Sequence, residues 1–257
     1  MESIKELRKI CQKTETDERI HFLQRKVSIY LTKILLYTPI TANQTTFLSM
    51  IMAIPSGIFF ASADFRCSFL GILFYWIYRL LDFSDGEIAR YRKQTSFRGQ
   101  YLDCVAPYIT DTFIFAGIGI GIYRQYYELW MLILAFSWLI AMTLNKAAVH
   151  IVYMLKCDFQ DRASGKKEAQ KVEVRKRSKI MSIILEAAFR ISTIFSIDST
   201  MVIYLIVIIL NFFVHIADLR VLLLVFYGIF YPIFSLIRVV QIFYTGEMIG
   251  RAAFLND

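Results

Sequence analysis

Acidic residues stand between long apolar stretches of this chain, in Asp82-Phe-Ser-Asp85-Gly86-Glu87-Ile-Ala89-Arg90 and, eight residues later, in Gly99-Gln-Tyr-Leu-Asp103. An ionised Asp close to hydrocarbon costs several kcal/mol unless it is paired with a cation or bound to a metal. A cluster of such carboxylates is hard to explain by packing. We therefore expect the functional site in this segment.

The composition is that of a membrane protein. The chain is 57% hydrophobic with a mean hydropathy of +0.50, and several apolar runs are long enough to cross a bilayer. A core of ~30 Å takes ~20 helical residues. The runs lack the alternation of β-barrel strands, so helices are expected. We predict an all-α polytopic membrane protein with about six transmembrane helices, near residues 43–63, 67–87, 100–123, 128–154, 198–217 and 220–244.

Two further segments have the character of helices at the membrane surface. Residues 19–37 place Arg25, Lys26 and Lys33 among apolar residues at helical spacing, which predicts an N-terminal interfacial amphipathic helix. Residues 179–196 form either a second interfacial helix or a short seventh span. We divide the chain into an N-terminal segment, residues 1–40, and a transmembrane domain, residues 41–257.

Basic residues gather on one side of this topology. They lie in the second-to-third connection (Arg90, Arg92, Lys93, Arg98) and in the fourth-to-fifth (Lys156, Arg162, Lys166, Lys167, Lys171, Arg175, Lys176, Arg177, Lys179). By the positive-inside rule, these connections, both termini and the acidic cluster face the cytosol. The net charge of +8 follows from the same rule and favours contact with anionic membrane lipids. Because the basic residues are confined to short connections, nucleic-acid binding is not expected.

The spacing of the acidic residues predicts a metal site. Asp82 and Asp85 are three residues apart and share one helix face, where Gly86 leaves room for a ligand, while Asp103 comes from the next helix. Carboxylate oxygens suit Mg²⁺, Mn²⁺ or Ca²⁺, and a metal held by few carboxylates completes its shell with phosphate oxygens. The pattern therefore indicates phosphoryl chemistry.

At these residues the chain resembles the CDP-alcohol phosphotransferase family, whose signature reads D-x2-D-G-x2-A-R-x8-G-x3-D-x3-D. The matching residues are Asp82, Asp85, Gly86, Ala89, Arg90, Gly99 and Asp103. Thr41-Ala-Asn43-Gln-Thr-Thr46 is similar to the family's T-P-N-x-x-T, with Ala42 in place of Pro.

The resemblance implies an integral-membrane transferase that moves a phospho-alcohol or phosphatidyl group from a CDP-linked donor to an acceptor alcohol and releases CMP. It implies that Asp82, Asp85 and Asp103 bind two Mg²⁺ or Mn²⁺ ions, which hold the donor's pyrophosphate. The residues implied to lie against the nucleotide and its phosphates are Asn43, Asp82, Asp85, Gly86, Ala89, Arg90 and Gly99. We also expect a homodimer.

One position departs from the signature. The fourth Asp, which in the family helps to hold a metal and is the proposed catalytic base, is replaced by Pro107. Asp111 is the nearest substitute, although it lies roughly 12 Å along the helix from Asp103 and about 80° around it. We therefore predict Asp103 and Asp111 as catalytic residues. Pro107 either shapes the site by kinking the helix or is a neutral kink.

The loss of the fourth Asp leaves several interpretations open. The acceptor could be already anionic, such as a phosphate or a carboxylate, with or without a lipid tail, and Lys146 with His150 could bind it; alternatively, another residue could supply the base. The chain could instead be a pseudoenzyme that binds CDP and metal without turnover, or, less in keeping with boundary carboxylates, an ion-coupled transporter. Arg79 either neutralises Asp82 or packs against a neighbouring helix. Glu87, at a variable position of the signature, is interpreted as solvated.

Overall fold

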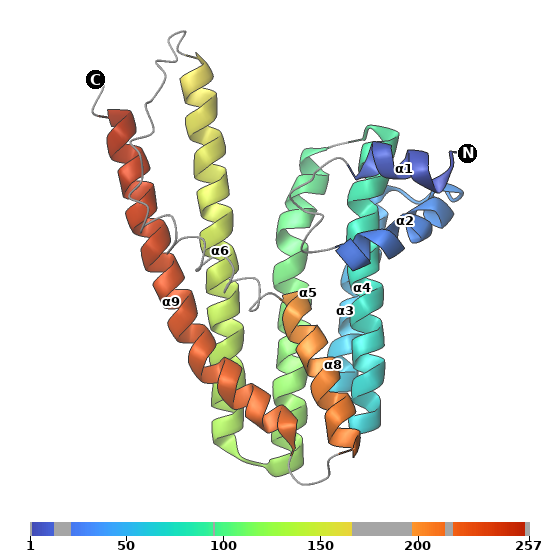
Figure 1. Cartoon of the computed structure of the whole chain (residues 1–257), viewed down its shortest axis with the longest axis vertical. Helices are drawn as coiled ribbons and strands as arrows, with labels where there is room; N and C mark the ends of the chain where they lie inside the picture. Colours follow the sequence, from blue (N-terminus) through green and yellow to red (C-terminus); the bar gives the residue numbers. More distant parts are fainter. Residues whose placement is uncertain (1, 13–21, 95, 166–196, 214–217, 255–257) are drawn as a thin grey trace.

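The computed structural model of the chain describes residues 2–12, 22–94, 96–165, 197–213 and 218–254. These residues form helices, and no strand occurs in the described ranges (Figure 1). The helices are α1 (Ile4–Cys11), α2 (Phe22–Leu36), α3 (Ala42–Ala61), α4 (Phe65–Arg92), α5 (Phe97–Tyr126), α6 (Leu129–Gly165), α8 (Ile197–Phe213) and α9 (Leu219–Phe254). The predicted all-α class is confirmed.

Within the described residues, five helices are long and apolar enough to cross a membrane. They are Ala42–Ala61, Arg66–Arg92, Phe97–Tyr126, Leu129–Ala148 and Leu219–Val240, and they match five of the predicted spans. The remaining predicted span, 198–217, corresponds to α8, which is apolar but only 17 residues long. The polytopic membrane architecture is thus confirmed, and the segment 179–196 lies outside the described residues.

Glycines set the crossing of α3 and α5. A Cβ added at Gly117 would collide with the backbone of Gly57, and a Cβ at Gly121 would collide with the carbonyl oxygen of Phe60. Small residues let transmembrane helices approach this closely. Because the two contacts advance along both helices in the same direction, α3 and α5 run parallel. Their first turns therefore lie at the same end of the bundle as the last turns of antiparallel α4.

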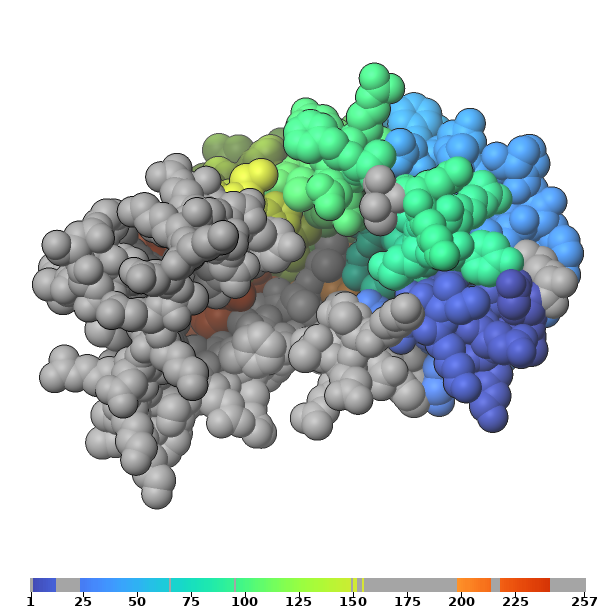
Figure 2. Space-filling model, turned by 90° about the horizontal axis from the view of Figure 1, so that it is seen from above, coloured from blue at the N-terminus to red at the C-terminus, as the bar shows by residue number. Residues whose placement is uncertain are grey.

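The N-terminal helices α1 and α2 cover this same end of α4 (Figures 1 and 2). Helix α1, which we did not predict, begins with a capping box in which Ser3 N donates to Glu6 at 2.8 Å and Glu6 N donates to Ser3 Oγ at 3.3 Å. Helix α2 buries the hydroxyl residues Ser28 and Thr32 against α4. Its opposite face exposes an apolar stripe of Val27, Tyr30, Ile34 and, just beyond the helix, Tyr37.

Helices α6 and α9 pack along each other and lean away from α4 toward the upper end of the molecule in Figure 1. Aromatic residues join this pair to the bundle. Trp138 of α6 stacks on Tyr227 of α9, with ring centroids 4.8 Å apart, and meets Phe115 of α5 edge-on at 4.6 Å. Such pairs contribute about 0.5–1.5 kcal/mol each beyond the area that they bury. The core therefore holds the lower half of the bundle together.

Candidate functional site

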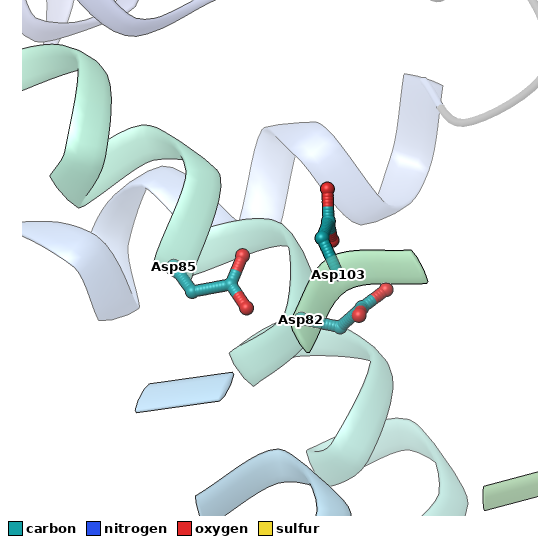
Figure 3. A group of neighbouring side chains, drawn as sticks. All are labelled: Asp82, Asp85 and Asp103. Carbon is teal, nitrogen blue, oxygen red and sulfur yellow. The ribbon is translucent and has the colours of Figure 1, made fainter. Parts of the chain in front are cut away.

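Three carboxylates meet between α4 and α5. Asp82 and Asp85 project from α4 and Asp103 from the first turns of α5, and one ligand atom from each lies within 4.8 Å of the others (Figure 3). Asp85 is buried, Asp82 is half-buried and Asp103 is exposed. The group therefore opens toward solvent on the side of α5.

This set of donors fits a divalent cation. All three residues offer carboxylate oxygens, which hard cations such as Mg²⁺ and Mn²⁺ prefer. Three like charges this close repel one another unless a cation lies between them. The predicted metal ligands thus lie together, as their spacing requires.

Neighbouring side chains fix the carboxylates on α4. Thr46 of α3 donates its hydroxyl to Asp85 Oδ2 at 2.6 Å. Arg79, one turn before Asp82 on α4, donates to Asp82 Oδ2 at 2.6 Å. Each bond leaves the second oxygen of its carboxylate available to a ligand. The expectation that Arg79 neutralises Asp82 agrees with this ion pair.

The other residues of the signature surround the carboxylates. Arg90 is exposed at the end of α4 and acts electrostatically on Asp103. A Cβ added at Gly86 would lie 3.3 Å from the Arg90 guanidinium, and one at Gly99 would lie 3.1 Å from Asn43 Oδ1. Asn43 and Gly99, more than fifty positions apart, are therefore neighbours beside the acidic cluster.

Asp111 lies outside this carboxylate group. It is buried on α5 and pairs with Lys146 of α6 through Oδ2, while Oδ1 is buried without a hydrogen-bond partner among the described residues. His150, one turn further along α6, meets the Tyr108 hydroxyl at 3.0 Å. Lys146 and His150 are thus both engaged within the bundle.

The sequence of the chain identifies the protein family to which this arrangement of helices and carboxylates belongs. The sequence profile of the CDP-alcohol phosphatidyltransferase family matches residues 39–224, which is most of the chain. The chain belongs to this family. It is accordingly a multi-pass membrane transferase of the CDP-alcohol phosphotransferase type, and the family resemblance seen in the signature is confirmed.

Solved structures show the same fold. The chain is similar to the phosphatidylinositol phosphate synthase PgsA1 of Mycobacterium tuberculosis with CDP-DAG bound, at a TM-score of 0.57 and 16% identity, over 86% of this chain and 93% of that one. The apo form of PgsA1 gives a TM-score of 0.53 and 16% identity, over 84% and 93%. No curated protein sequence matches the chain significantly.

Two features of this CDP-alcohol phosphatidyltransferase were missed or misread in the sequence. Asp198 of α8 holds Arg79 by two hydrogen bonds, of 2.7 Å from Nε and 2.8 Å from a terminal nitrogen, and accepts a third from the Tyr75 hydroxyl at 2.5 Å. The interpretation of Glu87 as solvated is wrong, because its side chain is buried against α2. Nothing near either residue in the sequence signals these partners.

Proposed function

We propose that the protein moves a phospho-alcohol or phosphatidyl group from a CDP-linked donor to an acceptor hydroxyl, using two Mg²⁺ or Mn²⁺ ions bound by Asp82, Asp85 and Asp103. The grouping of these three carboxylates within 4.8 Å carries the proposal. In the reaction, the acceptor oxygen forms a bond to the phosphorus of the transferred group, and the P–O bond to CMP breaks. The hydroxyl proton passes to a base.

The protein's own residues bind and orient the donor. Bound divalent cations would neutralise the pyrophosphate and the departing CMP. Thr46 keeps Asp85 turned toward the site, and Arg90 supplies a positive charge for the phosphates. Asn43 and Gly99 lie together beside the acidic cluster, and the missing side chain of Gly99 leaves room there for the nucleotide.

Asp111 is the proposed base. Lys146 holds Oδ2, and Oδ1 has no hydrogen-bond partner among the described residues, so an acceptor hydroxyl that enters between α5 and α6 can donate to it. Because Lys146 and His150 are engaged by Asp111 and Tyr108, a neutral hydroxyl acceptor is favoured over an anionic one.

The site is proposed to face the cytosol, in a homodimer. Four basic residues surround the short connection from α4 to α5 beside the carboxylates, and the positive-inside rule assigns such a connection to the cytosol. Residues 1–40 would then be a cytosolic segment that lies on the membrane surface, ahead of the transmembrane domain.

A pseudoenzyme is the second candidate. The observation that favours it is Pro107, which stands where the signature has its fourth Asp. A protein of this kind would bind CDP in a metal-dependent way and release no CMP.

One experiment tests both candidates. CMP release is measured from purified protein with Mn²⁺ and CDP-diacylglycerol, CDP-glycerol, CDP-ribitol or CDP-choline, each with a panel of acceptors. We expect release with one donor class and its loss in Asp85→Ala. The control is Asp64→Asn, which changes an Asp at the opposite end of α4 and keeps the helix cap. Metal-dependent CDP binding without release from any donor would select the pseudoenzyme, and full activity of Asp85→Ala would overturn the metal site.

A further inference from the structure

Glu87 is a buried carboxylate inside the signature that takes no part in the proposed chemistry. Its side chain is 1% exposed. It accepts hydrogen bonds from Ser28 Oγ at 2.8 Å, Thr32 Oγ1 at 2.6 Å and Gln12 Nε2 at 2.6 Å. Ser28 and Thr32 lie one turn apart on α2, and Gln12 caps the end of α1. One side chain of α4 therefore holds both N-terminal helices.

The donors to Glu87 match the requirements of a buried acid. A buried carboxylate is costly unless its oxygens accept hydrogen bonds. Ser28 and Thr32 are themselves fully buried, so their hydroxyls depend on Glu87 in return. On α2 these two polar residues lie opposite the exposed apolar stripe of Val27, Tyr30 and Ile34. The helix thus turns its polar face inward, toward this one acceptor.

Glu87 and the metal-site carboxylates occupy different faces of one helical turn. Residues two apart on a helix point roughly 200° away from each other, so Glu87 faces α2 while Asp85 faces α3 and α5. The attachment continues in the next turn, where Arg90 Nε donates to the Cys11 carbonyl at 2.5 Å. The part of α4 that carries Asp85 is therefore attached to α1 and α2 through Glu87 and, one turn later, through Arg90.

A small rotation of α4 would matter at the site. With side-chain tips about 5–6 Å from the helix axis, a rotation of roughly 20° moves a carboxylate by about 2 Å. Metal–oxygen distances tolerate only about 0.2 Å. The helix therefore needs an attachment close to the carboxylates themselves, and Glu87 is two residues from Asp85.

We propose that Glu87 is a positioning residue of the metal site: by accepting hydrogen bonds from α1 and α2 it fixes the rotation of α4, so that Asp82 and Asp85 converge with Asp103. This inference rests on the proposed function, because it assigns a role toward the metals that those carboxylates would bind. It distinguishes Glu87 from a residue that only adds stability, since metal affinity should change more than folding.

The test compares Glu87→Ala with the conservative Glu87→Gln. In Gln, a carbonyl oxygen at the Oε1 position still accepts from Ser28 and Gln12, and the NH2 group at the Oε2 position can donate to the Thr32 hydroxyl, which is also an acceptor, so the attachment persists. Tyr91→Phe is the matched control, because it cuts another contact of α4 with the N-terminal segment. This contact is the 2.6 Å bond from the Tyr91 hydroxyl to Glu2, just before α1 and one turn further from the carboxylates.

Two readouts are measured on full-length protein in lipid nanodiscs. The first is Mn²⁺ binding by electron paramagnetic resonance. We expect Glu87→Ala to weaken Mn²⁺ binding about 10- to 100-fold, as the loss of a residue that orients a metal ligand does, with Glu87→Gln and Tyr91→Phe close to wild type. The second is the rate of hydrogen–deuterium exchange of residues 82–90 without metal. We expect this rate to rise in Glu87→Ala and to stay at the wild-type value in Glu87→Gln and Tyr91→Phe.

The outcomes separate this inference from the proposed function. Unchanged Mn²⁺ binding in a folded Glu87→Ala, or an equal loss in Tyr91→Phe, would overturn the positioning role. If wild type binds no Mn²⁺, the metal proposal fails, and the exchange of residues 82–90 still shows whether Glu87 fixes this turn. If Glu87→Ala does not fold, the double variant Ser28→Ala/Thr32→Val removes two donors and leaves the signature intact. It should weaken Mn²⁺ binding in the same direction, and wild-type binding in that variant would refute the proposal.

Discussion

The ion pair between Arg79 and Asp198 gives a prediction whose size can be worked from the structure. Both side chains are nearly buried, with 12% and 8% of their surface exposed, and two hydrogen bonds of 2.7 and 2.8 Å join them. Removing one member of a buried pair costs about 3–5 kcal/mol when the other charge is left without compensation. In Asp198→Leu, Arg79 keeps its ion pair with Asp82, so we expect a smaller loss of about 1–3 kcal/mol, from the donors left without an acceptor.

The matched variant removes the cation instead. Arg79→Leu leaves both Asp198 and Asp82 without their cation, so it should cost about 3–5 kcal/mol, more than Asp198→Leu. Tyr75→Phe, which removes only the neutral hydroxyl that bonds Asp198, should cost about 0.5–1.5 kcal/mol.

The assay is the fraction of purified, detergent-solubilised protein that remains monodisperse after heating at a series of temperatures. The predicted order of stability is wild type, Tyr75→Phe, Asp198→Leu and then Arg79→Leu. Wild-type stability of Asp198→Leu, or an Arg79→Leu variant as stable as Asp198→Leu, would refute the reasoning about this network.

Three further predictions concern the base, the topology and the packing. Pro107→Asp should reduce CMP release, because the proline shapes α5. Asp111→Asn should abolish the acidic limb of the pH–rate profile, because Asp111 is the proposed base. Unchanged activity and pH dependence in both variants would leave Pro107 as a neutral kink and Asp111 without a role as base. In a cysteine-free background, Arg66→Cys should react with an impermeant thiol reagent outside intact cells and Gln94→Cys should not, and the reverse pattern would overturn the cytosolic site. Gly117→Leu should destabilise the protein by at least about 1–3 kcal/mol in the heating assay, since no space exists at the α3 crossing, and wild-type stability would contradict that packing.

Hydropathy predicted the membrane segments well but not the helix ends. The predicted span 67–87 stops where charged residues begin, whereas α4 continues to Arg92. Hydropathy reports which residues suit hydrocarbon, and a helix continues into water as long as its residues favour helical backbone and its end is capped. Helix α1 was missed because it is only eight residues long, which is too short for its pattern of apolar and charged residues to stand out.

The candidate site was predictable where spacing along one helix decides geometry. Asp82 and Asp85 share a face because they are three residues apart, and Asp103 joins them across a short connection. The partners that hold them were not predictable. Asp198 lies 119 positions from Arg79, and Ser28 lies 59 positions from Glu87. Such pairs depend on how the helices pack, which periodicity within a helix does not encode.

A Mn²⁺ titration most directly tests the central claim that Asp82, Asp85 and Asp103 form one metal site. Electron paramagnetic resonance measures the concentration of free Mn²⁺ while Mn²⁺ is titrated into wild type, Asp85→Ala and Asp64→Asn. Each protein is titrated with and without a CDP-linked donor. The account predicts saturable binding in wild type and Asp64→Asn, tighter when the donor is present, and its loss in Asp85→Ala. Undiminished, donor-enhanced Mn²⁺ binding in Asp85→Ala would contradict it.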